Sequence, residues 1–293
     1  MTSPALRRVP HIFLALALLA LAAGPAWAQT PTVQAVESAP VYEDVADLVI
    51  DSPVIVDATI RSAARIKGAE AAGVAPGHTR FYVEADVAAL IRGTGAIPSR
   101  IGWLVDVAPD WRGRTPNLKK RRVIAFARPV AGRPDQLQLV TPDAQRDWSP
   151  ALDALTRRIA QEAAAPDAPP VVTDIRNAFH VPGALPGEGE TQIFLKTRDD
   201  RPAALSILRR PGEQPRWSVA TSEIIDDSAA APARDTLLWY RLACFLPRTL
   251  PERSTAALSA DDAEQARADY RFVIEQLGTC RNGTDASGGG APT

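Results

Sequence analysis

Alternating apolar and polar positions predict a series of β-strands in the first half of the chain. From Val54 to Ile60 the apolar side chains occupy every second position, which is the period of a half-buried strand. Further strand segments follow, and turn residues separate them. The five expected strands span residues 54–61, 80–87, 101–107, 123–130 and 136–140. A short helix over 41–50 precedes them, and Ser149 and Pro150 begin another helix as its N-cap and first residue.

The second half has a different order, with strands first and helices afterwards. Three strands are expected at 191–198, 203–210 and 216–225, and Asp, Pro and Gly residues between them supply the turns of an antiparallel meander. Residues 171–180 fit either a strand or a short helix. The prolines of residues 165–170 cannot continue a helix, so this segment is expected to be a linker.

Residues 236–246 predict a buried helix at the centre of the second half. All of them except Thr236 and Arg241 are apolar or aromatic, and a helix that is apolar around its whole circumference is buried. Asp235 is expected to be its N-cap, and Pro247 is expected to end it. The segment is too short to cross a bilayer, which takes about 20 residues.

Residues 1–28 have the features of a signal peptide. An Arg-Arg pair near the start precedes an apolar stretch, and Ala26-Trp27-Ala28 fits the small-x-small cleavage rule. We therefore expect an exported protein, periplasmic or secreted, with no membrane span after cleavage. Residues 29–40 are expected to form a flexible lead, and the Gly- and Ser-rich residues 282–293 a disordered tail.

The only two cysteines, Cys244 and Cys280, are predicted to form a disulfide. Cys244 lies in the buried helix, and Cys280 follows a second helix that is expected to begin after its N-cap Ser259 and to end at Gly278. An exported protein meets an oxidising compartment, which favours a disulfide over a free thiol. Closing a loop of this length would stabilise the fold by about 3–4 kcal/mol.

These patterns together predict an α+β protein with two domains. Residues 41–164 are expected to form a five-stranded OB-like barrel with a closing helix. Residues 171–281 are expected to form a three-stranded antiparallel meander packed with two helices, and this domain contains the disulfide.

Three segments of residues 41–145 resemble the netrin-like and metalloproteinase-inhibitor-like OB domains of exported proteins. They are the helix-turn-strand of residues 46–56, the strand end Leu90-Ile-Arg-Gly93 and the strand start Arg122-Val-Ile-Ala-Phe126. The resemblance implies an OB fold. The inhibitory members present an N-terminal cysteine to the metal of the protease, and this half of the chain has no cysteine. For residues 171–281 no family is recognised.

The composition argues against several classes of function. The chain has 33 basic and 34 acidic residues, whereas nucleic-acid binding needs a basic face that displaces counterions. After removal of the signal peptide only His78 and His180 remain as histidines, so a histidine-based zinc site is not expected. No nucleophile elbow, P-loop or dinucleotide motif is present, and no cofactor is expected.

The leading hypothesis is therefore a non-catalytic binding or envelope-associated module, whose partner is an envelope protein or a glycan. OB barrels bind through one face and its loops, which directs attention to residues 110–122. Trp111 lies in a polar part of this segment and is expected to be exposed, where it could anchor a partner. The basic run Lys119, Lys120, Arg121 and Arg122 could bind an anionic surface, although such a run is more often a solvated loop.

The alternative hypothesis is an envelope hydrolase that uses the Gly- and Pro-rich segment around His180. In that reading His180 is a general base, and Glu188 or Glu190 orients its ring. The structural reading is a loop whose histidine donates to a backbone carbonyl, and no nearby residue is an evident nucleophile. Glu223, Asp226 and Asp227 could join Glu190 in a carboxylate pair or bind a hard cation, but a polar loop composition explains them equally well.

Overall fold

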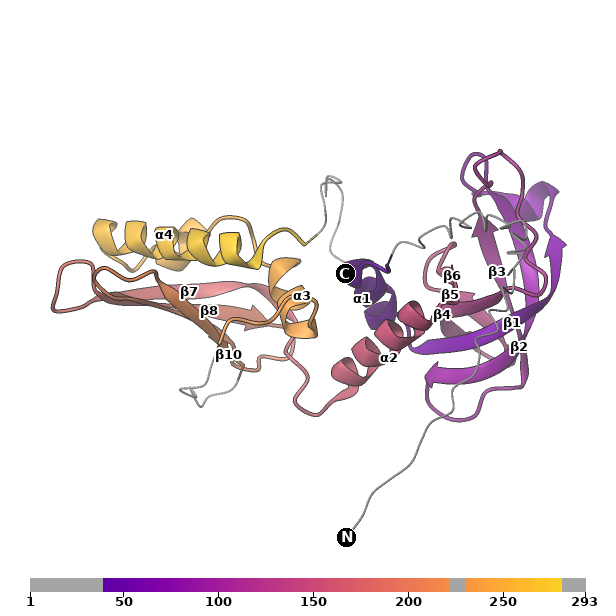
Figure 1. Ribbon diagram of the computed structural model, residues 1–293, viewed down its shortest axis with the longest axis horizontal. Helices are drawn as coiled ribbons and strands as arrows, with labels where there is room; N and C mark the ends of the chain where they lie inside the picture. The colour runs from indigo at the N-terminus through magenta and orange to yellow at the C-terminus, as the bar shows by residue number, and fades with distance from the viewer. Residues whose placement is uncertain (1–38, 222–229, 281–293) are drawn as a thin grey trace, which may run out of the picture. The chain divides into compact units, whose positions relative to one another are not determined.

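The computed structural model describes residues 39–221 and 230–280, which form four α-helices and ten β-strands in two separate sheets (Figure 1). The described residues all belong to one compact unit. The expected signal peptide, nearly all of the lead, the carboxylates of 223–227 and the tail 282–293 lie outside them. No helix in the described ranges is long and apolar enough to cross a membrane. The division into two domains stays a prediction.

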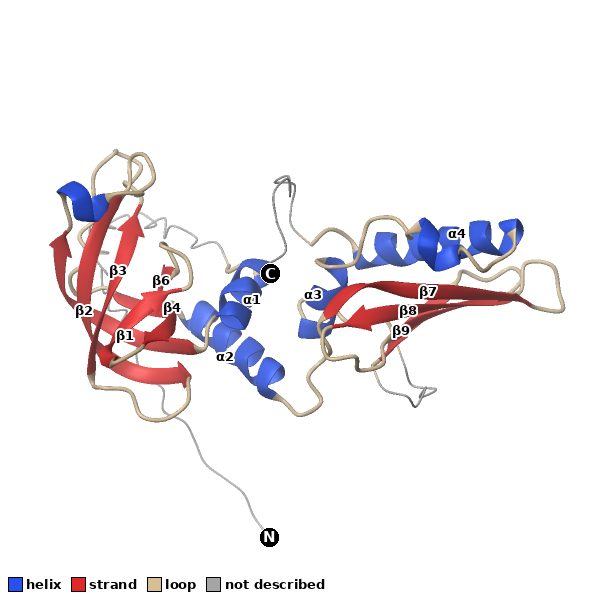
Figure 2. Ribbon diagram, turned by 180° about the vertical axis from the view of Figure 1, so that it is seen from behind, coloured by secondary structure: helices blue, strands red, loops and turns tan. Residues whose placement is uncertain are grey.

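The first sheet closes into a five-stranded barrel, which confirms the predicted barrel (Figure 2). Its strands are β1 (Val54–Arg65), β2 (Thr79–Arg92), β3 (Arg100–Val107), β4 (Arg122–Val130) and β5 (Arg133–Leu139). Their order is β1-β2-β3-β5-β4, and β4 pairs back with β1. All of these pairings are antiparallel except the parallel contact of β3 with β5 at Gly102 and Gln136. This arrangement is consistent with an OB-like barrel, and a short strand β6 (Gln145–Asp147) adds to β4.

The barrel core is apolar, and on some strands its buried side chains alternate with exposed ones. On β3, for example, Ile101, Trp103 and Val105 are buried, while Leu104 between them is exposed. Helix α1 (Tyr42–Asp51) precedes the barrel, and helix α2 (Pro150–Ala164) follows it and packs against α1. The predicted N-cap of α2 is confirmed, because the Ser149 hydroxyl accepts a hydrogen bond from the Leu152 amide at 3.2 Å.

The second sheet has four strands, so the predicted three-stranded meander is wrong. The expected strands are present as β8 (Gly189–Thr197), β9 (Ala204–Arg209) and β10 (Arg216–Ala220), and β7 (Val172–Pro182) adds a fourth. All neighbours are antiparallel. Two register shifts in β7 place Val172, Ile175 and Ala178 on the buried side, three residues apart. This spacing does not show the period of two, which is why residues 171–180 fitted either a strand or a helix.

The buried helix is confirmed, but its ends differ from the prediction. Helix α3 (Leu237–Ala243) is shorter than 236–246, and its C-cap is Cys244 rather than a residue beside Pro247. Its N-cap is Thr236 and not Asp235, because the Thr236 hydroxyl accepts from the Trp239 amide at 3.2 Å. Asp235 has a backbone φ of 60° and lies just outside the helix. Both candidates are good capping residue types, and the backbone direction of the preceding loop decides between them.

Helix α4 (Ala260–Leu277) covers one face of the second sheet, and its predicted ends are confirmed (Figure 1). Ser259 accepts a hydrogen bond from the Asp262 amide, and Gly278 ends the helix with a φ of 73°. The predicted disulfide is present, with a sulfur–sulfur distance of 2.00 Å between Cys244 and Cys280. It links the C-terminal ends of α3 and α4.

Helices α1 and α2 contact α3 through aromatic and carboxylate side chains. The Tyr42 ring lies 6.4 Å from the ring of Trp239, centroid to centroid. The Glu162 carboxylate of α2 accepts a hydrogen bond from the Leu237 amide at 3.0 Å, so it satisfies one free amide at the start of α3. The start of the buried helix is therefore partly capped by a residue far away in sequence.

Candidate functional site

The loop that carries Trp111 is held in one shape by the side chain of Asp110. Oδ1 of Asp110 accepts hydrogen bonds from the amides of Arg112 and Arg114 at 2.9 and 2.8 Å, and Oδ2 accepts from the Arg114 guanidinium. Trp111 is 84% exposed, as its polar surroundings predicted. The Arg112 guanidinium lies 4.2 Å from the centroid of its ring. The result is an exposed, ordered aromatic side chain on the barrel.

The four residues of the basic run do not act together. Lys119 and Lys120 are exposed, and neither has an ion-pair partner among the described residues. Arg121 instead pairs with Asp147 of β6. Arg122 donates to the buried carboxylate of Asp57 on β1 through two hydrogen bonds of 2.9 and 2.6 Å. Only the two lysines of this run therefore remain available to a partner.

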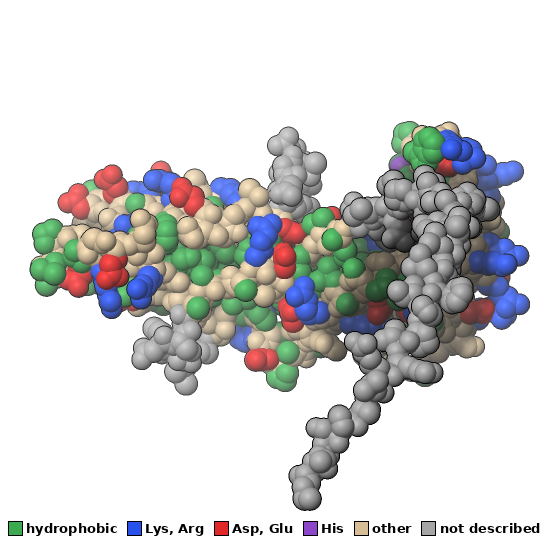
Figure 3. Space-filling view, viewed as in Figure 1, with side chains coloured by type: hydrophobic (Ala, Val, Ile, Leu, Met, Phe, Trp, Pro, Cys, Tyr) green, Lys and Arg blue, Asp and Glu red, His purple; other side chains and the backbone are tan. Residues whose placement is uncertain are grey.

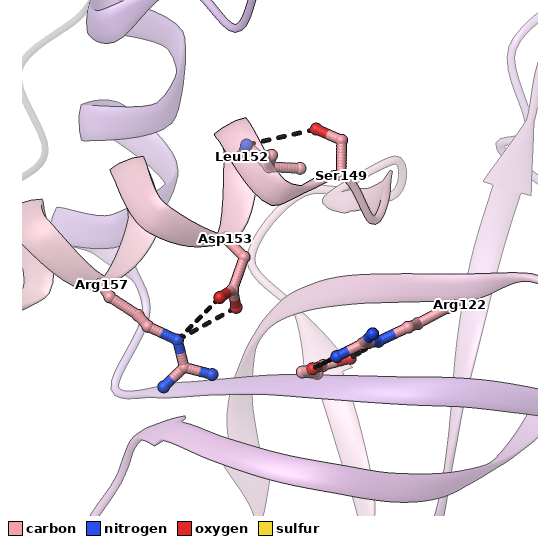
Figure 4. A network of polar contacts seen from close by, with 6 residues as sticks. Arg122, Ser149, Leu152, Asp153 and Arg157 are labelled. Atoms are coloured by element: carbon pink, nitrogen blue, oxygen red, sulfur yellow. Dashed lines mark hydrogen bonds and ion pairs between the residues drawn. The ribbon is translucent and has the colours of Figure 1, made fainter.

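Arg122 belongs to a polar network beside α2 (Figure 4). Its guanidinium lies 3.8 Å from the centroid of the Trp148 ring. The hydrogen bonds to Asp57 raise the pKa of Arg122 above its usual value, and the charge of Asp153 adds to the effect. Asp153 itself accepts two hydrogen bonds from Arg157 within α2.

Figure 3 shows that the outer edge of the barrel carries mostly basic side chains, whereas acidic and basic ones are interspersed over α4 and its sheet.

A groove of about 690 Å³ lies on the outside of the barrel along β2, β3 and β5. Its lining includes Tyr82 and Leu104 from the paired strands β2 and β3, and Gln136 and Gln138 from β5. A Cβ atom on Gly102 would lie 2.3 Å from the Tyr82 hydroxyl oxygen, so the absence of a side chain there leaves room for the tyrosine. The tyrosine ring is therefore seated across β3, within the groove.

Most charges of the groove compensate one another. Arg80 and Asp106 form two hydrogen bonds, from Nε to Oδ1 at 2.7 Å and from Nη2 to Oδ2 at 2.8 Å. Arg80 also donates to the carbonyl of Ala72 in the loop between β1 and β2, which connects that loop to the groove. Arg133 donates to the Gln136 side chain at 3.1 Å. Among the charged residues that line the groove, Arg133 alone lacks an ionic partner.

A second hollow, of about 420 Å³, lies on the face of the second sheet. Phe179 and Phe194 stand there edge to face, 5.8 Å apart between ring centroids. Ala204, Ser206 and Ser218 on the neighbouring strands provide only small side chains. The hollow thus arises from large residues on β7 and β8 beside small ones on β9 and β10.

His180 takes part in a buried polar network rather than in a site with the predicted glutamates. Its Nδ1 lies 2.9 Å from the hydroxyl of Thr191, which in turn donates to Asp269 of α4. A carboxylate only accepts hydrogen bonds, so the Thr191 hydrogen points to Asp269 and its oxygen accepts from Nδ1–H of His180. Arg209 and Gln265 also donate to Asp269, which is fully buried.

Glu188 and Glu190 make their hydrogen bonds elsewhere. Glu190 accepts hydrogen bonds from Gln192 at 2.9 Å and from Ser206 at 3.1 Å. Glu190 and Gln192 are the two neighbours of Thr191 on β8, so they lie on the face of the sheet opposite α4. Glu188 accepts from the Leu185 amide within its own loop. In the described part of the chain, neither carboxylate is hydrogen-bonded to His180. The structure therefore does not bring the three residues of the hydrolase hypothesis together.

The residues of the groove could not be recognised as a site from the sequence. Tyr82 and Gln138 lie at outward positions of predicted strands, and this periodicity was visible. Their proximity depends on β3 and β5 lying side by side, and no local pattern predicts that pairing. Within the described ranges, no group of three or more His, Cys, Asp or Glu residues is placed to hold a metal ion. No protein-family model matches the chain, and no curated protein matches it either.

Proposed function

We propose that this protein is an exported, non-catalytic binding module and that its barrel holds a neutral oligosaccharide. The observation that carries the proposal is the groove along β2, β3 and β5, because it is preformed and lined by a few well-placed polar groups beside apolar ones. The order of the barrel strands supports it as well, since OB barrels bind oligosaccharides and oligonucleotides on the face of the second and third strands.

The groups that line the groove suit the hydroxyl groups and flat faces of sugars. The side-chain amides of Gln136 and Gln138 each offer hydrogen-bond donors and acceptors. In the Arg80–Asp106 pair, the guanidinium offers donors and the carboxylate offers acceptors. The Tyr82 ring offers an aromatic surface with a polar tip. A neutral sugar chain can satisfy these groups without bringing its own charge.

An anionic polymer fits the groove less well. Binding a polyanion draws its affinity from unpaired Lys and Arg that release counterions. Here Arg80 already has a carboxylate partner, and Asp106 would repel phosphate or sulfate groups. Arg133 is the single uncompensated cation of the lining. A neutral chain is therefore the better ligand of the two classes that OB barrels bind.

The test is isothermal titration calorimetry of the chain from Gln29 onward against neutral oligosaccharides of four to six sugars, namely malto-, cello- and chito-oligosaccharides. We expect saturable binding of at least one series, and a roughly tenfold loss of affinity, about 1.4 kcal/mol, for Tyr82→Ala. Gln138→Ala should show a smaller loss. Thr59→Ala, an exposed position on β1, serves as the matched control.

Two results would contradict the proposal. One is binding that Tyr82→Ala leaves unchanged while the variant remains folded by circular dichroism. The other is the absence of any binding to the three series, together with binding of a polyanion such as heparin. The second result would assign the barrel to anionic ligands.

A second candidate, a partner protein of the envelope, is favoured by the exposed and ordered Trp111 with Lys119 and Lys120 nearby in sequence. Trp and Arg are enriched among the residues that dominate protein interfaces. We expect Trp111→Ala to abolish capture of such a partner from an envelope extract, and Lys119→Glu with Lys120→Glu to weaken it. Tyr82→Ala should leave it unchanged. Capture that survives both loop variants would rule out this surface.

A further inference from the structure

Arg241 of α3 differs from every other buried charged residue in the described part of the chain. It is only 8% exposed, yet it has no hydrogen-bond acceptor and no carboxylate within ion-pair distance there. Each of the four buried acids has an arginine partner. The pairs are Glu43 with Arg234, Asp57 with Arg122, Asp106 with Arg80, and Asp269 with Arg209.

Two further arginines lie close enough to Arg241 for their charges to act on it. Helix α3 lies beside the end of β8, where the turn to β9 carries Arg198 and Arg201 (Figures 1 and 2). Burial lowers the pKa of Arg241, and the charge of Arg201 and, to a smaller extent, that of Arg198 lower it further, while Asp199 and Tyr240 offset part of this effect. The turn also carries two acids, Asp199 and Asp200. The Asp199 carboxylate already accepts from Arg201 at 2.6 Å, and Asp200 pairs with Arg176. Neither carboxylate forms an ion pair with Arg241.

A largely buried guanidinium without a partner is costly, because it has lost most of its hydration and gained no hydrogen bonds in return. An unsatisfied buried polar group needs an explanation, and a bound ion is one such explanation. Its nitrogen atoms are not sealed off. The only fully enclosed side-chain polar atoms without a partner in the described ranges belong to Ser52, Trp148 and Thr156. The nitrogen atoms of Arg241 are not among them, so the guanidinium keeps some contact with solvent.

We propose that Arg241 is the centre of an oxyanion-binding site, with Arg201 and Arg198 providing the surrounding positive charge. The planar fork of a guanidinium matches two oxygens of a carboxylate or a phosphate group. Such a ligand supplies the missing acceptors and the missing negative charge together. This site lies on α3 and the β8–β9 turn, so it does not depend on the proposed function of the barrel groove.

The test compares oxyanions with chloride at equal ionic strength. The thermal midpoint of the chain from Gln29 onward is measured in sodium chloride, with increasing sodium phosphate or sodium acetate. Calorimetric titration with the same salts then gives the affinity. We expect a saturable rise of the midpoint above that in chloride, because ligand that binds only the folded state stabilises it. A larger effect of phosphate would indicate a phosphate-bearing ligand, and a larger effect of acetate a carboxylate ligand.

The decisive variant is Arg241→Met, which removes the charge and keeps an unbranched stem of similar shape. We expect its oxyanion affinity to fall roughly tenfold or more. In chloride alone it should be at least as stable as the parent, because an unpaired buried charge has been removed. Arg216→Met is the matched control, since Arg216 is a well-exposed arginine of β10, and it should keep the full response.

Two outcomes would overturn the proposal. The first is an oxyanion response that is equal in the parent and in Arg241→Met, since phosphate also stabilises proteins by exclusion from their surface. The second is no response above chloride in the parent. Arg241→Lys adds a further check, because it keeps the positive charge but lacks the planar guanidinium that can donate two parallel hydrogen bonds. Its oxyanion affinity should lie between those of the parent and Arg241→Met.

Discussion

The guanidinium of Arg122 holds the buried carboxylate of Asp57 with two hydrogen bonds across 65 residues of sequence. Asp57 is 1% exposed, so its charge depends on this partner for compensation. The Arg122 guanidinium also lies over the Trp148 ring, so it connects β1 and β4 with the residue before the N-cap of α2. A residue expected to contact a binding partner therefore has a structural role in the barrel.

Replacing Arg122 should destabilise the barrel, whereas replacing Arg121 should not. Arg122→Gln leaves the Asp57 carboxylate buried without a counter-charge. Arg121→Gln removes only an exposed pair with Asp147, and such pairs contribute little. We expect the urea midpoint of Arg122→Gln to fall clearly below that of the parent, and that of Arg121→Gln to remain close to it. Equal midpoints for the two variants would contradict the assignment.

The network around Asp269 should stabilise the packing of α4 on its sheet. Asp269→Asn removes the charge that accepts from Arg209, Gln265 and Thr191, and it leaves Arg209 partly buried without its partner. We expect a loss of about 2–4 kcal/mol in the free energy of unfolding. Asp261→Asn, at an exposed position in the first turn of α4, is the control and should change it by less than about 1 kcal/mol. A small effect of Asp269→Asn would show that the network is not structural.

Stability should fall at alkaline pH because of two buried tyrosines. Burial is the main cause that raises the pKa of Tyr42 and of Tyr270 well above the ordinary value near 10. Above pH 10 the unfolded chain releases these protons while the folded chain keeps them, so their contribution is complete below pH 10 and is lost as the pH rises. Each should lower the free energy of unfolding by up to about 1.4 kcal/mol per pH unit.

This pH dependence can be measured by urea unfolding between pH 8 and pH 11.5. Tyr270→Phe should reduce the slope above pH 10, although it also loses the hydrogen bond of the hydroxyl to the carbonyl of Pro247. Tyr42→Phe should reduce it in the same way. An unchanged slope in the double variant would show that other groups cause the alkaline loss.

The disulfide should contribute about 3–4 kcal/mol, because it closes a loop between residues 36 apart. The variant with both Cys244→Ser and Cys280→Ser should lose this amount in urea unfolding. The parent protein in a strong reductant should lose a similar amount, which controls for the serine hydroxyls. A loss below about 1 kcal/mol would mean that the packing of α3 against α4 holds the two ends without the bond.

Several features of the fold were visible in the sequence because they depend on neighbouring residues. The apolar alternation from Val54 onward and the caps Ser149 and Ser259 act within one strand or one helical turn. The disulfide followed from there being only two cysteines. The exposure of Trp111 followed from its polar neighbours. In each of these cases a local pattern or a simple count was sufficient.

The sequence by itself determined the five barrel strands, the presence of a buried helix within 236–246 and the near-neutral charge that argues against nucleic-acid binding. Only the tertiary structure decided which residues meet. It placed β3 beside β5 and so formed the groove around Tyr82, and it paired Arg122 with Asp57. It also joined His180 to Thr191 and Asp269 instead of Glu190, and left Arg241 without a partner. The physical reason is that periodicity and capping are short-range, whereas these contacts depend on strand order, register and helix packing across the whole chain.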